Sequence, residues 1–228
     1  MIFIMYMIKS PTLGRAHELV IERILKYGRY ELDTEENERT VELPEPSNIH
    51  VENPFSGYMV SKYSNIQEKF MNEYVTSLLE GTEADFVYTY HDRLFHYDNV
   101  IDQIDLIIKK LRNNPTSRRA QAITWYPEVD AIAKEPPCLQ RVQYLVRDGR
   151  LNQYLEFRSN DMLMAAGANM YALAHLQKYV ADELGLEVGW YEHTSVSAHI
   201  YYMRDHSDLM VFVNGCNLHH LESVQKYL

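Results

Sequence analysis

The side chain with the most reactive chemistry in this sequence stands directly behind two prolines. Pro136 and Pro137 restrict the backbone before Cys138, because the proline ring fixes φ. The runs Arg118-Arg119 and Arg158-Ser159-Asn160-Asp161 flank predicted strands on either side of it. Guanidinium groups and a hydroxyl are the donors that bind a phosphate dianion, and arginine near a cysteine lowers the pKa of its thiol. The combination predicts an enzyme that uses a thiolate nucleophile on a substrate that carries a phosphate group.

Each of these features also has a simpler interpretation when it is taken alone. An isolated cysteine is usually a small buried apolar residue, an arginine pair usually belongs to a solvated surface, and Asp161 fits the cap of a turn before a helix. A metal site is a further alternative, since His91, Asp92, His96 and Asp98 are close in sequence. Their spacing is not that of metal ligands on one helix, so we expect no bound metal.

Composition and charge limit the class of protein. The 228 residues are 46% hydrophobic and 24% charged, which is typical of a globular chain, and the length fits a single domain over 1–228. The net charge of −10 argues against a general nucleic-acid binder, which carries a basic stripe. No apolar run reaches the roughly 18–20 residues of a membrane helix. Two cysteines suit a reducing compartment, and the opening MIFIMYMIKSP predicts a buried strand rather than a signal, so we expect a cytoplasmic protein.

Hydrophobic periodicity predicts interspersed helices and strands. Helical stripes indicate helices over 14–28, 64–81, 99–112 and 168–184, with Ser64 as an N-cap. Period-two patterns indicate strands near 40–43, 120–125, 139–147, 150–158, 198–202 and 209–213. Asp148-Gly149 is a hairpin signal, and the rest of 29–54 is expected to be a loop. Because a regular βαβ repeat is missing, we predict an α+β fold with a mixed, antiparallel-rich sheet and packed helices.

Seven short motifs occur in the order and approximate spacing of a known enzyme family. They are IDQI (101–104), NPTSRR (114–119) leading to Trp125, PPC (136–138), QYLV (143–146), RSND (158–161), GAN (167–169) and HIY (199–201). Over 102–201 the chain resembles thymidylate synthase, in particular the short, divergent archaeal type of that family. The resemblance implies the fold shared by thymidylate synthases and deoxycytidylate hydroxymethylases.

The resemblance also implies the chemistry. The Cys138 thiolate would add to C6 of the uracil ring of deoxyuridine monophosphate (dUMP) and make C5 nucleophilic, which divides a difficult carbon–carbon bond formation into steps. The co-substrate 5,10-methylenetetrahydrofolate would supply the one-carbon unit and the hydride, giving thymidylate (dTMP) and dihydrofolate. Whether the donor is this folate or a modified pterin is left open.

Residues that match the family's phosphate site follow from the resemblance. Arg158 and Ser159 match phosphate binders, and Arg158 would also lie beside the nucleophilic sulfur. Arg118 and Arg119 match the pair that reaches the phosphate of the partner subunit, so a homodimer is implied. An earlier arginine that completes this site, with Arg39 as a candidate, is not fixed by the sequence.

Residues that match the base and sugar sites lie later in the chain. Asn169 matches the amide that pairs with the O4/N3 edge of uracil, where it donates and accepts together. His199 and Tyr201 match the pair that holds the sugar hydroxyl. Asp161 matches the aspartate that fixes the pyrimidine and approaches the folate ring.

A tyrosine completes the implied machinery. Tyr88 matches a tyrosine implicated in removing the C5 proton, with Arg93 at the corresponding later spacing. Tyr90 is a close rival, and the sequence leaves the choice between Tyr88 and Tyr90 open.

The chain also departs from the family pattern, mainly on the folate side. Leu139 stands where a histidine usually follows the nucleophile, Phe157 replaces a polar residue, and 195–197 replace a Gly-Gly-Asp stretch. Two alternatives therefore stay open: a pyrimidine-nucleotide hydroxymethylase acting on dUMP or deoxycytidine monophosphate (dCMP), in which water replaces the hydride, and a catalytically weak nucleotide-binding dimer. Asn169 argues against the dCMP version, since those enzymes place an aspartate there, and the retained cysteine argues against pure binding.

Overall fold

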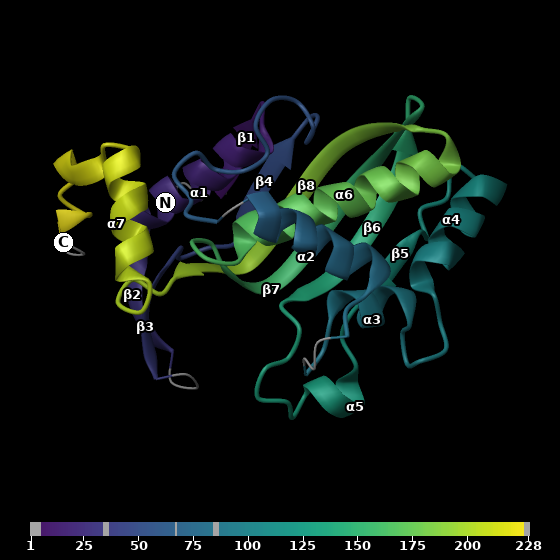
Figure 1. The fold of residues 1–228 in the computed structure, drawn as a ribbon, viewed down its shortest axis with the longest axis horizontal. Helices are drawn as coiled ribbons and strands as arrows, with labels where there is room; N and C mark the ends of the chain where they lie inside the picture. Colours follow the sequence, from purple (N-terminus) through teal and green to yellow (C-terminus); the bar gives the residue numbers. More distant parts are fainter. Residues whose placement is uncertain (1–5, 34–36, 67, 84–86, 226–228) are drawn as a thin grey trace.

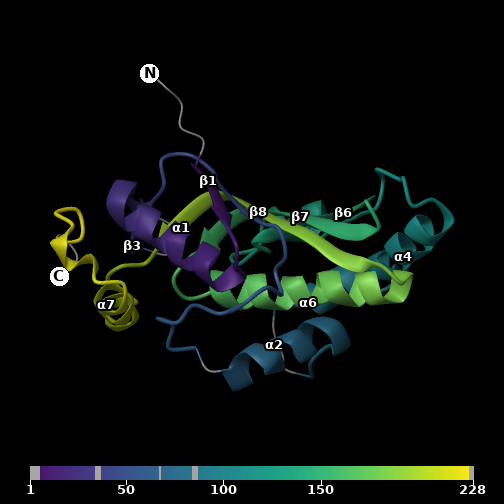
Figure 2. The same ribbon diagram turned by 90° about the horizontal axis from the view of Figure 1, so that it is seen from above.

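A mixed β-sheet with helices on one face forms the framework of the protein (Figures 1 and 2). The computed structural model describes residues 6–33, 37–66, 68–83 and 87–225. The main strand order is β1 (Tyr6–Ser10), β4 (Ser47–Val51), β8 (Glu187–Ile200), β7 (Arg150–Asp161), β6 (Leu139–Arg147) and β5 (Gln121–Ile123). A hairpin of β2 (Arg29–Asp33) and β3 (Glu38–Glu42) joins this sheet through β3, which pairs with β8.

The strand directions confirm the predicted fold class. The pairs β1/β4 and β7/β8 are parallel, whereas β4/β8, β6/β7, β5/β6 and β2/β3 are antiparallel. The β6–β7 hairpin turns at Asp148-Gly149, where both residues have positive φ (50° and 73°), as a type I′ turn requires.

Within the described residues, no helix is long and apolar enough to cross a membrane.

The central helix α6 (Ala166–Leu184) connects the two parallel strands β7 and β8 and packs on both. It is apolar on most sides and ends at Gly185, whose left-handed φ of 66° favours glycine. The helix α2 (Glu68–Glu80) lies against the outer side of α6, so Figure 2 shows three layers: the sheet, α6 and α2. The helices α1 (Leu13–Tyr27) and α4 (Gln103–Asn113) contact α6 at either end.

Shorter helices complete the chain. These are α3 (Tyr90–Phe95), α5 (Pro127–Asp130), α7 (His206–Gly215) and a 3₁₀ turn over Leu218–His220. The prediction of a strand at 209–213 was wrong, because these residues form α7 and bury Leu209, Phe212 and Val213. That i, i+3, i+4 spacing is helical, and a five-residue apolar run does not distinguish strand from helix.

Other differences concern the N-terminal part and the starts of helices. The prediction of a loop over most of 29–54 was wrong, because β2, β3 and β4 occupy most of it. The first two are an outlying hairpin with many exposed side chains, so their apolar signal is weak. The predicted helices at 64 and 99 begin four residues later, at Glu68 and Gln103, the latter capped by Asp102. The first strand covers Tyr6–Ser10, and residues 1–5 of that prediction lie outside the described residues.

Candidate active site

The thiol of Cys138 lies beside the guanidinium of Arg158. The Nη2 atom of Arg158 is 3.8 Å from the Cys138 sulfur, and the same guanidinium donates to the carbonyls of Pro136 (2.7 Å) and Pro137 (3.0 Å). Cys138 immediately precedes β6, as predicted, and an irregularity in the β6/β7 register follows at Leu139–Arg141. The two prolines therefore present carbonyls that hold Arg158 in place, and Arg158 places a positive charge next to the sulfur.

A cavity of about 870 Å³ opens over this pair. Eight of the ten residues predicted for the site line it: Cys138, Arg158, Ser159, Asp161, Asn169, His199, Tyr201 and Tyr88. They come together because the C-terminal ends of β7 and β8 lie in register, with Asp161 opposite His199, next to the start of α6. The volume lies within the range of ligand pockets, roughly 300–1,000 Å³.

The remaining two predicted residues lie outside this cavity. Arg118 and Arg119 are exposed in the segment before β5 and do not line it. Arg39 is exposed on β3 and does not line it either. Within one chain, Arg158 and Arg204 are therefore the arginines of the site.

The buried amide of Asn169 is held from the neighbouring helix. Asn169 lies in the first turn of α6 and is only 7% exposed. Its Oδ1 accepts a hydrogen bond of 2.8 Å from the hydroxyl of Tyr74 on α2. Burial raises the pKa of Tyr74, so this hydroxyl stays protonated at neutral pH. No described residue donates to or accepts from the Nδ2 atom of Asn169, which leaves that donor for a ligand.

The carboxylate of Asp161 shares a charge cluster with Arg204. One oxygen accepts from the backbone N–H groups of Leu163 and Met164 (3.1 and 3.2 Å), and the other is 2.7 Å from Nη2 of Arg204. Burial raises the pKa of Asp161, while His199 and Arg204 lower it and Asp205 raises it. The carboxyl group therefore stands between opposing influences on its charge.

The same arginine covers the ring of a predicted sugar-site residue. The guanidinium carbon of Arg204 is 3.9 Å from the ring centroid of Tyr201, and Nη2 of the same group is 2.7 Å from a carboxylate oxygen of Asp205. The rings of His199 and Tyr201 meet edge to face at 5.0 Å, and Nδ1 of His199 is 3.3 Å from the Ser197 hydroxyl. Both side chains are buried against the cavity, so their orientation is fixed by protein contacts.

Two tyrosines lie on the other side of the cysteine. Tyr90 accepts a hydrogen bond of 3.1 Å from the backbone N–H of Leu139, which ties it to the cysteine loop. The pKa of Tyr88 is raised, first by burial and then by the charge of Cys138. Their rings are 5.9 Å apart, both line the cavity, and the Tyr88 hydroxyl contacts the backbone of Cys138 and the side chain of Tyr90, so both tyrosines are tied to the cysteine loop.

A buried polar chain supports the strand that carries Arg158 and Asp161. Asn160 Nδ2 donates to Nε2 of His193 (2.8 Å), so Nδ1 of His193 carries the proton and donates to the Tyr191 hydroxyl (3.0 Å). Burial, with a smaller effect of His17, lowers the pKa of His193 to about 3. His193 also stacks on Phe157 at 4.5 Å. The neutral imidazole therefore holds Asn160, which lies between Arg158 and Asp161 on β7.

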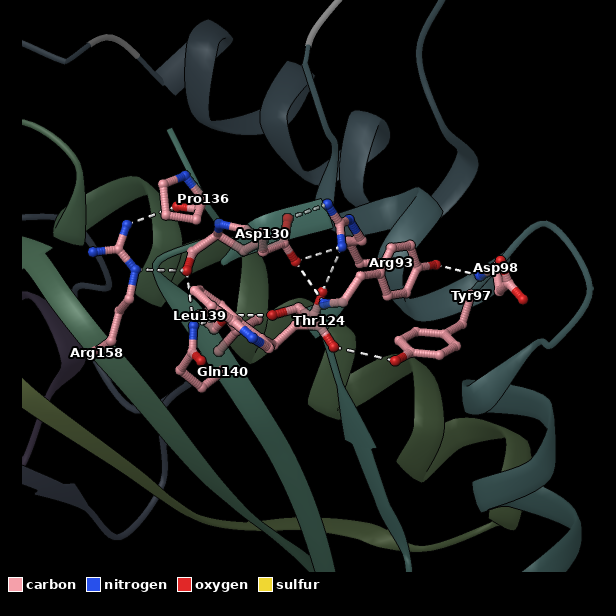
Figure 3. Close-up of polar contacts among 12 residues, drawn as sticks. Arg93, Tyr97, Asp98, Thr124, Asp130, Pro136, Leu139, Gln140 and Arg158 are labelled. Carbon is pink, nitrogen blue, oxygen red and sulfur yellow. Dashed lines mark hydrogen bonds and ion pairs between the residues drawn. The ribbon is translucent and has the colours of Figure 1, made fainter. Parts of the chain in front are cut away.

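A buried ion pair holds the segment that leads to the cysteine (Figure 3). Arg93 of α3 binds both oxygens of Asp130 at 2.8 Å and the carbonyl of Thr124 at 2.9 Å. The Thr124 hydroxyl donates to the carbonyl of Leu139. Arg93 also lies 3.9 Å from the ring centroid of Tyr126. These contacts connect α3 and α5 to the backbone next to Cys138.

Comparison with known proteins agrees with this geometry. A sequence model described as thymidylate synthase matches residues 55–228. The chain belongs to the thymidylate synthase family. A protein of Methanocaldococcus jannaschii named "Putative thymidylate synthase" is 40% identical over 220 residues, which are 93% of this chain and 98% of that protein. Proteins of the same name from Methanosarcina barkeri (41% over 172 residues, 74% and 77% of the two chains) and Methanococcoides burtonii (38% over 198 residues, 86% and 89%) are also similar.

Three cavity residues of this thymidylate synthase family member had not been expected from the sequence. Tyr74, Asp130 and Arg204 all line the cavity. In the sequence, Tyr74 belongs to a segment with the pattern of an amphipathic helix, and Asp130 belongs to a polar segment. Arg204 is an isolated arginine that follows HIYYM. Only the tertiary contacts with Asn169, Arg93 and Asp161 distinguish them.

Two of the four residues considered as a metal site bond to other groups. Nδ1 of His91 bonds to the carbonyl of Leu78, and Asp92 accepts from the Thr89 hydroxyl that caps α3. Across the described ranges, no group of three or more His, Cys, Asp or Glu side chains is arranged to hold a metal ion.

Proposed function

We propose that this protein is a thymidylate synthase that methylates dUMP at C5 with 5,10-methylenetetrahydrofolate, through a covalent bond between Cys138 and C6. The observation that carries the proposal is the pairing of a thiol and a guanidinium, 3.8 Å apart, in a cavity that also contains the Asn169 amide. Pure binding of a nucleotide needs the amide and the arginine, but it does not need a thiol held beside a positive charge.

Arg158 prepares the cysteine for attack. Its positive charge favours the thiolate form, which is the nucleophilic form of cysteine. The thiolate forms a bond to C6 of the pyrimidine, and the electron pair of the C5–C6 double bond moves toward C5 and O4. After C5 has been substituted, its proton leaves, the S–C6 bond breaks and the thiolate returns. Tyr88, which lies beside Cys138 and stays protonated at neutral pH because its pKa is raised, is our candidate for positioning the acceptor of that proton.

The rest of the cavity matches the parts of the nucleotide. Arg158 and Ser159 would bind the phosphate, since no described residue bonds the Nη1 atom of Arg158 or the Ser159 hydroxyl. Asn169 would pair with the base. His199 and Tyr201, buried side by side, would hold the sugar hydroxyl.

The cavity also has a lining that fits the folate co-substrate. Leu78, Trp125, Ala131 and Ala133 add an apolar and aromatic set of walls, which suits a flat heterocycle. Asp161 stands at the same cavity and would bind the polar edge of that ring. When bound, 5,10-methylenetetrahydrofolate supplies the methylene group and the hydride.

We further propose a homodimer in which the partner completes the phosphate site. In our proposal one chain provides only Arg158 and Ser159 for the phosphate, since Arg118 and Arg119 are exposed outside the cavity. The sheet offers a surface for a partner, because alternate residues of β8 between Val188 and Val196 are partly exposed, and Val196 is 50% exposed. A second copy on this face would cover them.

The direct test is turnover with product identification. Incubation of the protein with dUMP and methylenetetrahydrofolate should give dTMP and dihydrofolate, identified by mass. A 5-hydroxymethyl product would replace the synthase with a hydroxymethylase. Binding of dUMP without any product would leave only a nucleotide-binding protein.

A further inference from the structure

Tyr74 lines the cavity together with Ser77 and Leu78 of the same helix α2, and it is the one of the three that bonds to Asn169. Its hydroxyl donates to Oδ1 of Asn169 at 2.8 Å, and both residues line the cavity. We propose that Tyr74 sets the base preference of the site, by holding the Asn169 amide in the one orientation that pairs with uracil. The inference rests on the proposed function, since it concerns the same nucleotide site.

The Tyr74 hydroxyl acts as a hydrogen-bond donor. Its pKa is raised by burial, so it keeps its proton at neutral pH. Asn169 Oδ1 is the one hydrogen-bond acceptor that the described part of the chain provides for this proton. The ring is held in place from outside by Phe70, which stacks on it with an angle of 4° and a centroid distance of 6.3 Å. The Tyr74 hydroxyl therefore donates its hydrogen bond to the amide oxygen of Asn169.

This contact decides what the amide presents to a base. With Oδ1 of Asn169 turned toward Tyr74, Nδ2 remains as a donor, and Oδ1 keeps one lone pair as an acceptor. Uracil offers a carbonyl acceptor at O4 and a donor at N3–H, so it matches this pattern. Cytosine offers an amino donor at position 4 and an acceptor at N3, so it requires the flipped amide. In the flipped amide, Nδ2 faces Tyr74, and the phenol proton loses its acceptor.

The Tyr74→Phe variant keeps the aromatic ring but has no hydroxyl, so flipping the Asn169 amide no longer leaves a hydrogen-bond donor without its acceptor. The measurement is the ratio of dissociation constants of dCMP and dUMP for the full-length protein, obtained by calorimetry. We expect wild type to prefer dUMP, and we expect Tyr74→Phe to reduce the preference by roughly 5- to 150-fold, the factor for one buried polar group left without a partner. Most of the change should appear as tighter binding of dCMP.

Tyr171→Phe is a closely matched control. The Tyr171 hydroxyl donates to Oδ1 of Asn72 at 3.1 Å, so the pair joins the same two helices with the same chemical groups, outside the cavity. A contact that only held α2 against α6 would make both variants lose affinity for the two nucleotides alike. We expect Tyr171→Phe to leave the ratio unchanged.

An aspartate at position 169 provides the second comparison. A carboxylate has no amide to flip, so in an Asn169→Asp background the Tyr74→Phe change should alter the ratio by no more than roughly twofold, the limit for independent effects. Tyr74→Met takes the place of Tyr74→Phe if the latter does not fold. An unchanged ratio in the folded Tyr74 variant overturns this inference alone. Failure of wild type to bind either nucleotide overturns the proposed function and this inference with it.

Discussion

The two cysteines of the chain lie in opposite electrostatic surroundings. Cys138 has the guanidinium of Arg158 beside its sulfur. The pKa of Cys216 is instead raised to about 12 by burial and by the carboxylates of Glu22 and Glu18. Thiolate character, rather than the presence of a thiol, decides reactivity. The chain therefore contains its own internal control for any cysteine chemistry.

Arg204 should control the charge of Asp161. Burial raises the pKa of this carboxyl group, and Arg204 and His199 oppose the rise, while Asp205 adds to it. Removing the cation in Arg204→Gln takes away a lowering influence, so the pKa of Asp161 should rise further. If the ionised carboxylate is required, the acid limb of the pH profile of kcat/KM should move to higher pH.

A surface pair provides the control for that profile. Arg150 pairs with Glu187 with both side chains more than half exposed (55% and 77%), so Arg150→Gln should leave the acid limb where it is. An acid limb that stays in place or moves to lower pH in Arg204→Gln would contradict the role given to Arg204.

At the residue scale, the sequence is informative where site residues belong to regular elements. Arg158, Asp161 and His199 lie at the ends of strands, and Asn169 lies in the first turn of a helix, so ordinary periodicity brings them to one edge of the sheet. Tyr74 could not be predicted in this way. Its role depends on how far α2 approaches α6, which no local pattern records.

At the scale of elements, the Arg93–Asp130 pair holds α3 and α5 to the segment before Cys138. Both side chains are buried (8% and 2% exposed). Asp130→Ala would leave Arg93 as a buried charge without its partner, which costs about 3–5 kcal/mol of unfolding free energy. Urea denaturation measures this change, and the rate of adduct formation at Cys138 should fall with it.

Asp182→Ala is the matched variant for the element scale. Asp182 pairs with Lys178 on the outside of α6, with exposed fractions of 60% and 49%, and such a helix pair contributes only about 0.3–0.5 kcal/mol. Equal losses in the two variants would show that the Arg93–Asp130 pair does not hold this segment.

The elements that were predicted correctly share strong local signals. The β6–β7 hairpin has long alternating strands and an Asp-Gly turn, and α6 has a broad apolar surface that ends at a left-handed glycine. Strand β2 was missed because residues 29–32 are exposed, whereas β3 overlaps the strand predicted near 40–43 and buries Thr40 and Val41. The helix α7 was misjudged because its apolar run is short and rich in residues that favour strands.

At the scale of the whole molecule, one hydrophobic core extends from Ile8 to Val224, which agrees with our proposal that 1–228 form a single catalytic domain. The helices lie on one face of the sheet (Figure 2). The other face, with the half-exposed residues of β8, is the surface on which we place the partner subunit.

Mixing two inactive variants tests the shared site. Arg119→Ala chains keep Cys138, and Cys138→Ser chains keep Arg119. If the arginine serves the partner's phosphate, a mixed dimer contains one complete site, and activity should return to as much as about a quarter of wild type in a random one-to-one mixture of dimers. Mixed dimers that form but stay inactive would place Arg119 in its own chain's site, or in neither.

The account depends most directly on a bond between Cys138 and C6 of the nucleotide. Incubation with 5-fluoro-dUMP and methylenetetrahydrofolate should trap this bond, because fluorine at C5 cannot leave as a proton does. Mass spectrometry of the digested protein should then find the added mass on the peptide that contains Cys138 and no added mass on the peptide that contains Cys216. Serine is far less ionised than cysteine at neutral pH, so Cys138→Ser should bind the nucleotide and show no adduct. An adduct on Cys216, or one that persists in Cys138→Ser, would contradict the account.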